Sequence, residues 1–423
     1  MTAVLGDREP GSTATRAPRL LYVDEFPPSN HHGGAILLKR LLDKHPADRL
    51  LVITSKVGMK ASEATELFKC RHIALPVFGR SRYPWVGKFM RAANWLGLPF
   101  VALIAILEIR RKRVEAVITI VRGRYYFAAA LAAWVTATPH ITIVHDSFVS
   151  ASASPSSVLR TGLRLLTRMT LRKAAHIYVV SLEMQRLVLR ECGRESEIQM
   201  PSTAVPTRQA EGQRQTTSEA GPVILYAGTI NYAVRDCLDL LADLIATGQL
   251  KEYGMSGAKL HLCSAMTDTE MRTSGWDRLD IVCRGWVPQS ELPSVLSSAD
   301  ILFLPYSFLQ SSREAVETAF PSKTADYLAA GKPVLVFGPK YSSLVRYASE
   351  QGFAEVVDEF SAGALARGIQ KIAFSPHYRE ELAARALEVF SANHDISRQQ
   401  HKFYLTIERV IHASPRGKVA RVP

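Results

Sequence analysis

Two adjacent glycines in the first half of the sequence could bind an anion. Gly33 and Gly34 follow the apolar segment Leu20–Val23 and open a helical pattern. Glycines at a helix start let backbone N–H groups approach an anion closely, and the helix dipole favours negative charge there. A flexible turn followed by a helix cap explains the same residues without a ligand.

A histidine–aspartate pair follows another apolar segment of the first half. His145 and Asp146 come directly after Ile141–Val144, which has the pattern of a buried strand. Titratable groups at the carboxyl end of a parallel strand face the ligand-binding edge of the sheet, where His145 could donate to a substrate hydroxyl and Asp146 could orient it. A capped turn is the alternative without a function.

The segment FPSKTADYLAAGKPV, residues 320–334, combines a helix start with a cation. We expect Ser322 to be a helix N-cap, with Lys323 and Asp326 on one face of the first turn. A lysine at a helix N-terminus is unfavourable against the helix dipole unless an anion compensates it. The pattern predicts a phosphate held by Lys323, with Asp326 free to accept from sugar hydroxyls. A solvated helix face is the alternative.

Two further turns of the second half follow short apolar segments. Gly228 and Thr229 come directly after Val223–Ala227, and Arg235 follows a few residues later, which is a second pattern typical of a phosphate site. Trp286 and Val287 follow another apolar segment, and from the residue type alone we expect Trp286 to pack in the core.

Short apolar segments alternate with helical patterns along most of the chain, which predicts an α/β fold with parallel sheets. A polar segment interrupts this alternation at residues 201–221, so we expect two doubly wound, Rossmann-like domains facing a central cleft. The expected strands are Leu20–Val23, Leu50–Thr54, Ala116–Ile120, Ile141–Val144 and Ile177–Val180 in the first series, and Val223–Ala227, Lys259–Cys263, Ile281–Cys283, Ile301–Leu304, Val334–Phe337 and Ala354–Val357 in the second.

These patterns divide the chain into six parts. We expect a flexible N-terminus at 1–18, a first domain at 19–200, a linker at 201–221 and a second domain at 222–376. C-terminal helices at 377–412 should cross back to the first domain, and a polar tail follows at 413–423. Because ligands of open α/β sheets bind beyond the carboxyl ends of the strands, chemistry should occur between the two domains.

Composition excludes several classes of protein. The 423 residues are 47% hydrophobic and 22% charged, which excludes wholesale disorder and collagen-like chains. Five scattered cysteines indicate neither a disulfide framework nor a zinc site, and fit a reducing compartment. No signal-peptide pattern is present. The longest apolar run, Trp95–Leu107, is too short to span a bilayer and is expected to form a buried helix, so we expect a cytoplasmic protein.

The net charge of +13 is distributed unevenly. Residues 1–200 hold 29 Lys and Arg against 15 Asp and Glu, whereas residues 201–423 are nearly balanced. Four arginines recur every four residues on a predicted helix at Ser157–Lys173, and a basic cluster at 110–113 follows the run Trp95–Leu107. We expect this half to meet an anionic membrane surface, which would hold the protein at the cytoplasmic face of the membrane. The four arginines are Arg160, Arg164, Arg168 and Arg172.

Taken together, these motifs resemble the nucleotide-sugar glycosyltransferases of the GT-B fold, in particular glycosyltransferase family four. The resemblance covers about Leu20 to Ile411. It is carried by Gly33-Gly34 and V-H-D in the first domain, and by Y-A-G-T-I, G-W-V, A-D-I-L-F-L-P and P-S-K-T-A-D-Y-L-A-A-G-K-P-V-L in the second.

The resemblance implies that the first domain receives the acceptor and the second binds the donor. It also implies a role for each motif. Gly33 and Gly34 would lie against the donor diphosphate, and His145 would contact the transferred sugar. Arg235 and Lys323 would neutralise the departing diphosphate. The remaining implied donor contacts are Trp286 and Val287 for the base, and Asp326 for the ribose.

One position departs from the family pattern. An earlier glutamate usually stands eight positions before the ribose-binding acid, and here that position is Thr318, with Glu317 beside it. Glu317 is therefore a candidate substrate-binding residue. We expect the donor sugar to be arranged differently from that in other members of the family. The resemblance implies retention of anomeric configuration. It also implies activity without a metal or another cofactor, with the nucleotide-sugar as substrate.

The expected activity is hexosyl transfer from a nucleotide-sugar to a sugar or lipid-linked acceptor in polysaccharide or glycolipid assembly. Three alternatives remain: a nucleotide-sugar epimerase of the same fold, a catalytically inactive relative, and a basic nucleic-acid-binding protein. No recognised nucleic-acid-binding module supports the last, so nucleic acid is not an expected partner.

Overall fold

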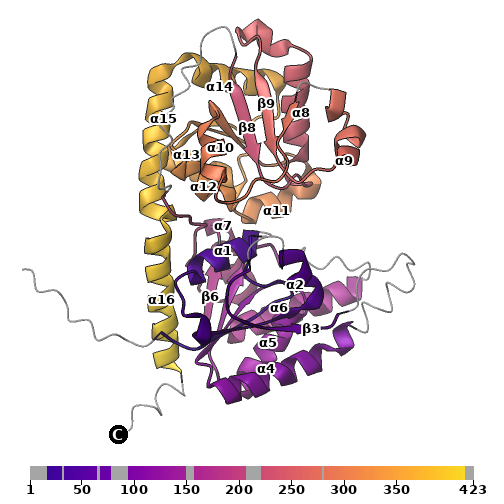
Figure 1. The fold of residues 1–423 in the computed structure, drawn as a ribbon, viewed down its shortest axis with the longest axis vertical. Coiled ribbons are helices and arrows are strands. Elements are labelled where there is room, and N and C mark those ends of the chain that lie inside the picture. The colour runs from indigo at the N-terminus through magenta and orange to yellow at the C-terminus, as the bar shows by residue number, and fades with distance from the viewer. Residues whose placement is uncertain are drawn as a thin grey trace, which may run out of the picture.

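Two parallel β-sheets stacked along the long axis of the molecule form the framework of the protein (Figure 1). The computed structural model describes residues 17–30, 33–63, 67–77, 94–148, 157–205, 221–278 and 281–414. The predicted flexible N-terminus, linker and tail lie mostly outside these ranges. The sheet in each domain matches the predicted α/β class with doubly wound topology.

The first domain contains seven parallel strands in the order β3-β2-β1-β4-β5-β6-β7. Alternate side chains of β1 point to opposite faces of this sheet: Leu20 and Tyr22 pack towards α1 and α16, and Leu21 and Val23 towards α4 and α5. The strands are β1 Leu20–Val23, β2 Leu50–Ser55, β3 Arg71–Leu75, β4 Ala116–Ile120, β5 His140–Val144, β6 His176–Val179 and β7 Glu197–Ile198. The helices are α1 Gly33–Leu42, α2 Lys56–Glu63, α4 Leu98–Lys112, α5 Tyr125–Val135, α6 Ser157–Lys173 and α7 Leu182–Cys192.

The second domain contains six parallel strands in the order β10-β9-β8-β11-β12-β13. The strands are β8 Val223–Ala227, β9 Lys259–Cys263, β10 Ile281–Cys283, β11 Ile301–Pro305, β12 Val334–Phe337 and β13 Ala354–Val357. The helices are α8 Arg235–Ala246, α9 Asp268–Thr273, α10 Leu292–Ser297, α11 Arg313–Thr318, α12 Lys323–Ala329, α13 Ser343–Gln351 and α14 Ala362–Phe374.

Two C-terminal helices run along both domains (Figure 1). Helix α15, Pro376–Val389, packs on the second domain, and a π-helical turn leads from it into α16, Ile396–Ala413. Phe403 and Ile407 of α16 are buried in the core of the first domain. The chain therefore crosses between the domains again after the linker.

Hydrogen bonds and ion pairs join the two domains at their facing ends. Ser147, just after β5, donates a 2.5 Å hydrogen bond to Glu314 of α11. Arg346 of α13 donates at 3.1 Å to Glu183 of α7. These contacts hold the carboxyl edges of the two sheets towards each other.

Helix α4 is only half buried, so the prediction of a buried helix for the apolar run Trp95–Leu107 is wrong for one face. Val101, Ala105 and Ile109 pack in the core, whereas a stripe of other apolar side chains is exposed. That stripe consists of Leu96, Phe100, Leu103 and Leu107. None of the described helices is both long enough and apolar enough to cross a membrane.

Candidate active site between the domains

Three segments that are distant in the sequence meet at the start of α1. A β-carbon at Gly33 would lie 3.2 Å from His145 Cε1 and 3.4 Å from Ser322 Oγ. Gly33 and His145 belong to the first domain and Ser322 to the second, so this point lies where the two domains face each other. Because any side chain at position 33 would crowd both neighbours, the glycine keeps the start of α1 accessible to a ligand.

His145 lies at the carboxyl end of β5 with a nitrogen available for a ligand. Its Nδ1 is 3.5 Å from Oδ1 of Asp146, and its side chain is largely buried. Its buried Nε2 has no hydrogen-bond partner among the described residues. The exposed Asp146 carboxylate can orient the imidazole, and Nε2 faces the Gly33 region.

Lys323 is a buried cation at the start of α12. Its Nζ donates a 2.6 Å hydrogen bond to Tyr226 Oη and lies 3.9 Å from the centre of that ring. No carboxylate lies within ion-pairing distance of it in the part of the chain that the structure describes. Burial lowers the pKa of the Lys323 ammonium to about 7. A buried ammonium without a counter-ion is typical of a site that an anionic ligand completes.

The turn after β8 surrounds this lysine. A β-carbon at Gly228 would lie 2.5 Å from Lys323 Nζ, and Gly228 has a φ of +144°, so both space and backbone conformation require glycine. Tyr226 Oη in turn donates a 2.7 Å hydrogen bond to the carbonyl of Thr229. The structure therefore brings the predicted residues Gly228, Thr229 and Lys323 together.

Arg235 already has protein partners. Its Nε donates at 2.8 Å to Asp239 one turn later, and its guanidinium lies 4.3 Å from the centre of the Trp276 ring. Neither Nη makes a hydrogen bond to the described residues, but an anion at the start of α8 would compete with Asp239 for the guanidinium. We therefore expect Arg235 to contribute less than Lys323.

The prediction that Asp326 is free is wrong, because an arginine from the other domain binds it. Arg40 Nη2, near the end of α1, donates to both Asp326 oxygens at 2.9 and 3.2 Å, and Arg40 Nη1 donates at 2.9 Å to the carbonyl of Ser202. Both side chains of the ion pair are nearly buried, with 13% and 12% exposed. Oδ1 also accepts at 3.4 Å from Gln289 Nε2, so it is Oδ2 that keeps a lone pair with which Asp326 can still accept from a hydroxyl.

Two other predictions need correction. Ser322 occupies the N-cap position of α12, but its side chain makes no capping hydrogen bond, because the residue has helical φ and ψ rather than the extended backbone of a capping serine. Trp286 is half exposed and does not pack in the core, whereas Val287 packs against the core of the second domain. Trp286 stands on a loop after the short strand β10, where no layer covers it.

Glu317 lines a charged pocket between the domains. The pocket has a volume of about 220 Å³ and is also lined by Thr318, Arg164 and Arg346. Glu317 is partly exposed and lies 3.9 Å from Arg313 Nε, one turn earlier on α11. The departure from the family pattern at Thr318 therefore lies at the domain interface.

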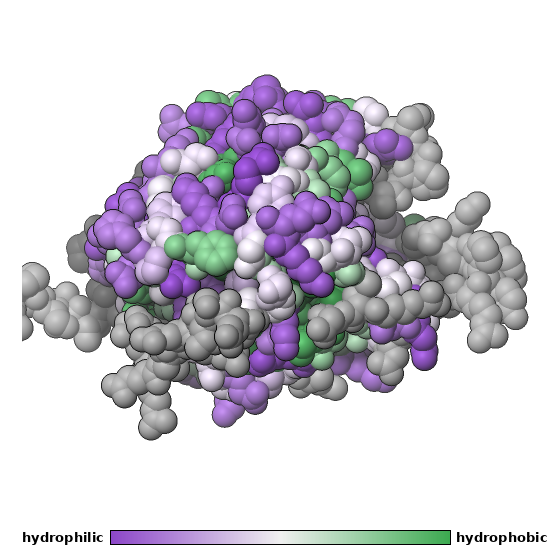
Figure 2. Space-filling view, turned by 90° about the horizontal axis from the view of Figure 1, so that it is seen from above, coloured by the Kyte–Doolittle hydropathy of each residue, from purple (hydrophilic) through white to green (hydrophobic). Residues whose placement is uncertain are grey.

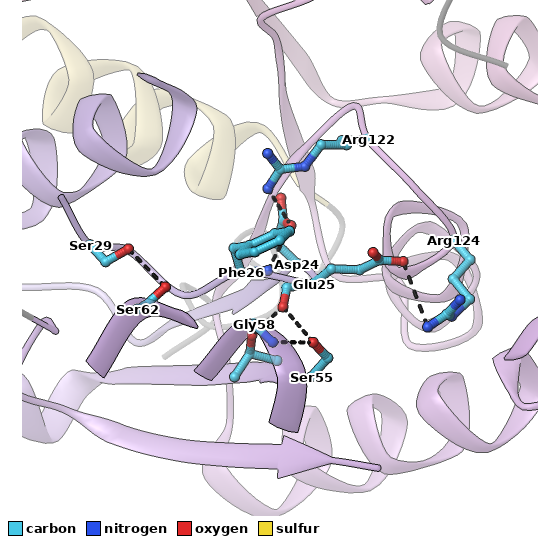
Figure 3. Close-up of polar contacts among 10 residues, drawn as sticks. Asp24, Glu25, Phe26, Ser29, Ser55, Gly58, Ser62, Arg122 and Arg124 are labelled. Atoms are coloured by element: carbon cyan, nitrogen blue, oxygen red, sulfur yellow. Dashed lines mark hydrogen bonds and ion pairs between the residues drawn. The ribbon is translucent and has the colours of Figure 1, made fainter. Parts of the chain in front are cut away.

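An acidic and basic cluster that the sequence analysis did not single out stands at the centre of the first sheet (Figure 3). Asp24 follows β1 and is fully buried, and Arg122, which follows β4, donates to it at 2.9 Å. Burial raises the pKa of Asp24, and Arg122 opposes this rise. The neighbouring pair Glu25 and Arg124 lies at 3.8 Å.

This cluster lies where the strand order reverses, between β1 and β4, which is the position where open α/β sheets bind ligands. The signal was available in the sequence, because Asp24 follows a strand just as His145 does. The described residues contain no group of three or more His, Cys, Asp or Glu side chains placed to hold a metal ion.

Comparison with known families finds one that resembles the second domain. Residues 221–373 match the family model described as glycosyl transferases group 1. The second domain is thus similar to the group 1 glycosyl transferases over this range, which is less than half of the chain. It contains the turn at Gly228, the buried Lys323 and the Arg40-bound Asp326. Among curated protein sequences, none matches this chain.

The fold of the whole chain is the GT-B fold of several solved structures. Sucrose-phosphate synthase from Thermosynechococcus elongatus is 16% identical with a TM-score of 0.69, over 94% of this chain and 100% of that one. HepE from Anabaena, solved in complex with UDP, is 12% identical with a TM-score of 0.64, over 92% and 100%. A putative UDP-N-acetylglucosamine 2-epimerase from Listeria monocytogenes is 12% identical with a TM-score of 0.58, over 95% and 98%. At these identities the likeness establishes the predicted fold alone.

Proposed function

We propose that this protein transfers a hexosyl group from a nucleoside diphosphate sugar to an acceptor hydroxyl, with retention of anomeric configuration and without a metal or other cofactor. The observation that carries the proposal is the meeting of Gly33, His145 and Ser322 across the domain interface. The match to the group 1 family and the UDP-bound HepE structure support a nucleotide-sugar donor, and a UDP-sugar is the first donor to test.

In this proposal the donor diphosphate lies between the start of α1 and Lys323. Negative charge develops on the diphosphate as the bond to the sugar breaks. The N–H groups at Gly33 and Gly34 and the Lys323 ammonium are placed to stabilise that charge. Because the ammonium is buried and has no carboxylate partner, its attraction to the diphosphate is weakly screened.

The remaining proposed contacts are to the transferred sugar and to the nucleoside of the donor. Nε2 of His145 has no protein partner among the described residues and faces the meeting point, so it is placed to contact the transferred sugar. Trp286 and Val287 would hold the base, and Asp326 would accept from the ribose. Glu317 would lie beside the donor sugar.

A screen of donors tests the proposal directly. The purified protein is incubated with UDP-, GDP- and ADP-glucose, and release of the nucleoside diphosphate is measured with and without candidate sugar acceptors. Acceptor-dependent release from one donor supports the transferase. Conversion of a UDP-sugar to its isomer without any acceptor would instead support the epimerase alternative, and binding without turnover would support an inactive relative.

Asp326→Asn should weaken donor binding by roughly tenfold, because a hydrogen bond to a charged group contributes about 1.5–3 kcal/mol. We expect a higher KM for the donor, a nearly unchanged kcat and unchanged inhibition by inorganic diphosphate, which lacks a ribose. Glu388→Gln, exposed on α15, is the matched control in steady-state kinetics. Equal weakening of diphosphate inhibition would assign Asp326 to domain packing instead.

The proposed acceptor is lipid-linked, in polysaccharide or glycolipid assembly at an anionic membrane face. The predicted basic stripe on α6 is not free to meet that membrane, because Arg164 and Arg168 both bind Glu191 of α7. The exposed face of α6 carries Leu165 and Met169 instead. The membrane-binding surface is therefore better placed on the exposed apolar side chains of α4 and α6, with the basic cluster at 110–113 beside them.

The proposed membrane-binding surface lies at one end of the molecule. Helices α4 and α5 pack against each other at the end of the first domain that is away from the second (Figure 1). Seen from above, at the second-domain end, the surface is mostly hydrophilic with scattered apolar residues (Figure 2). We expect only the first-domain end to enter the membrane surface.

Replacing both Phe100 and Leu103 by glutamate should abolish sedimentation with vesicles that contain anionic lipid, at low salt. The exposed positions should tolerate the change, and two charges there oppose insertion into the headgroup region. Leu405→Glu, exposed on α16, is the matched control. Wild-type protein that stays in the supernatant at low salt would contradict the membrane proposal and favour a soluble acceptor.

A further inference from the structure

One arginine of the first domain joins three parts of the chain beside the proposed ribose contact. Arg40 Nη2 donates to both oxygens of Asp326 on α12, at 2.9 and 3.2 Å. Its Nη1 donates at 2.9 Å to the carbonyl of Ser202, which follows the last strand of the first domain. The backbone carbonyl of Arg40 accepts at 2.8 Å from Nε2 of Gln400 on α16. Arg40 therefore contacts the second domain and both segments in which the chain passes between the domains.

The bonds to Asp326 leave one position of its carboxylate open. Oδ1 accepts from Arg40 and, at 3.4 Å, from Nε2 of Gln289, whereas Oδ2 accepts from Arg40 at 3.2 Å. Gln289 belongs to the same loop as Trp286 and Val287, which would hold the base. The carboxylate therefore lies beside the loop assigned to the base, and Oδ2 keeps the lone pair that a ribose hydroxyl would use.

Arg40 holds this carboxylate from outside the second domain. Its guanidinium is planar, so the bond from Nη1 to the Ser202 carbonyl fixes the plane in which Nη2 reaches Asp326. Both side chains of the ion pair are nearly buried, and their attraction is weakly screened. Without Arg40, the Asp326 carboxylate would keep only the 3.4 Å contact with Gln289 among the described residues and could turn away from the ribose.

We propose that Arg40 is a positioning residue for the donor. It orients Asp326 from the first domain, so that Asp326 accepts from a ribose hydroxyl only while α1 lies against α12. This proposal rests on the proposed function, because it takes Asp326 as the ribose contact. It adds that the nucleoside site of the second domain depends on a side chain of the first domain. Arg40 itself would touch neither the donor nor the reacting atoms.

The test compares the binding of UDP and of 2′,3′-dideoxy-UDP, which lacks both ribose hydroxyls, by calorimetry. Wild type should bind UDP about tenfold more tightly, because the dideoxy nucleotide loses a hydrogen bond to a charged acceptor. In Arg40→Met this preference should disappear through weaker binding of UDP. The affinity for dideoxy-UDP should stay as in wild type, because that nucleotide has no hydroxyl for Asp326 to accept from.

Two further variants separate this role from folding and from packing of the domains. Arg40→Lys keeps the charge beside Asp326 but lacks the planar fork that also reaches Ser202, so the preference should fall below the wild-type value. If Arg40→Met does not fold, this variant decides the test. Arg346→Met removes another arginine that joins the domains, through its 3.1 Å contact with Glu183, and should keep the full preference for UDP.

Several results would overturn the proposal. Equal weakening of both nucleotides in Arg40→Met would mean that Arg40 only holds the domains together, and tighter binding of UDP would mean that it competes with the ribose. An unchanged preference in both Arg40 variants, or equal binding of the two nucleotides by wild type, would also contradict it. If wild type prefers GDP or ADP, the dideoxy form of that nucleotide is used. Failure to bind any nucleoside diphosphate would instead count against the glycosyltransferase itself.

Discussion

Replacing Lys323 by methionine is expected to lower turnover about a hundredfold at saturating donor, with the fold intact. Loss of one group that stabilises developing charge costs roughly 3 kcal/mol in the transition state. Methionine keeps most of the side-chain volume beside Gly228 and Tyr226. Lys340→Met, on an exposed lysine of the same domain, is the control in steady-state kinetics. Near-normal turnover of Lys323→Met would remove this lysine from the catalytic machinery.

The pH dependence of UDP binding tests the same lysine independently. Because burial lowers the pKa of Lys323 to about 7, the free protein loses this charge as the pH rises above 7, and diphosphate binding must then take up a proton. UDP affinity should fall by up to tenfold per pH unit above 7 in wild type. Lys323→Met should not show this fall, and titration of UDP itself is common to both proteins.

The folding stability of the protein without a ligand should change with pH in the opposite direction, rising as the pH rises above 7. The unfolded chain keeps the Lys323 proton up to its ordinary pKa near 10.4, whereas the folded chain releases it near 7. Lys323 therefore destabilises the folded protein most below pH 7, and this cost falls as the pH rises towards 10. Lys323→Met should raise the thermal midpoint at pH 7. A lowered midpoint would mean that the lysine has a structural role.

Replacing His145 by alanine is expected to lower turnover about a hundredfold while UDP affinity changes by less than twofold. The imidazole lies at the meeting point of the domains with Nε2 free of protein partners among the described residues, so its contact should be with the transferred sugar rather than with the nucleotide. Kinetics give the first quantity and calorimetry with UDP the second. Equal losses in both would indicate that His145 only supports the start of α1.

Asp146→Asn provides the comparison for His145. The Asp146 carboxylate is exposed and lies 3.5 Å from Nδ1 of His145, so we expect it to orient the ring without contacting the sugar. Asp146→Asn should lower turnover by less than tenfold. A loss as large as that of His145→Ala would assign Asp146 a direct role in the reaction.

Local sequence patterns were sufficient to predict most of the sheet. Runs of apolar residues four to six long mark β1, β4, β8 and β12, because strands of a parallel sheet are buried on both faces. Strand β3 was missed: its sequence RHIAL begins with two polar residues, and its edge position leaves them exposed or half buried. The glycine positions at 33 and 228 were also predictable, because residue type and a preceding strand together indicate an anion-binding turn.

The sequence by itself determined which chemical groups are present and which strand ends carry them. Tertiary structure decided which of these groups have hydrogen-bond and ion-pair partners. Arg40 and Asp326 lie 286 positions apart and pair only because α1 and α12 face each other across the domain interface. The α6 arginines form a basic stripe in the sequence, yet Arg164 and Arg168 pair with Glu191 because α7 packs against that face. Helical periodicity places a residue on a face, but only the packing of whole elements determines what that face meets.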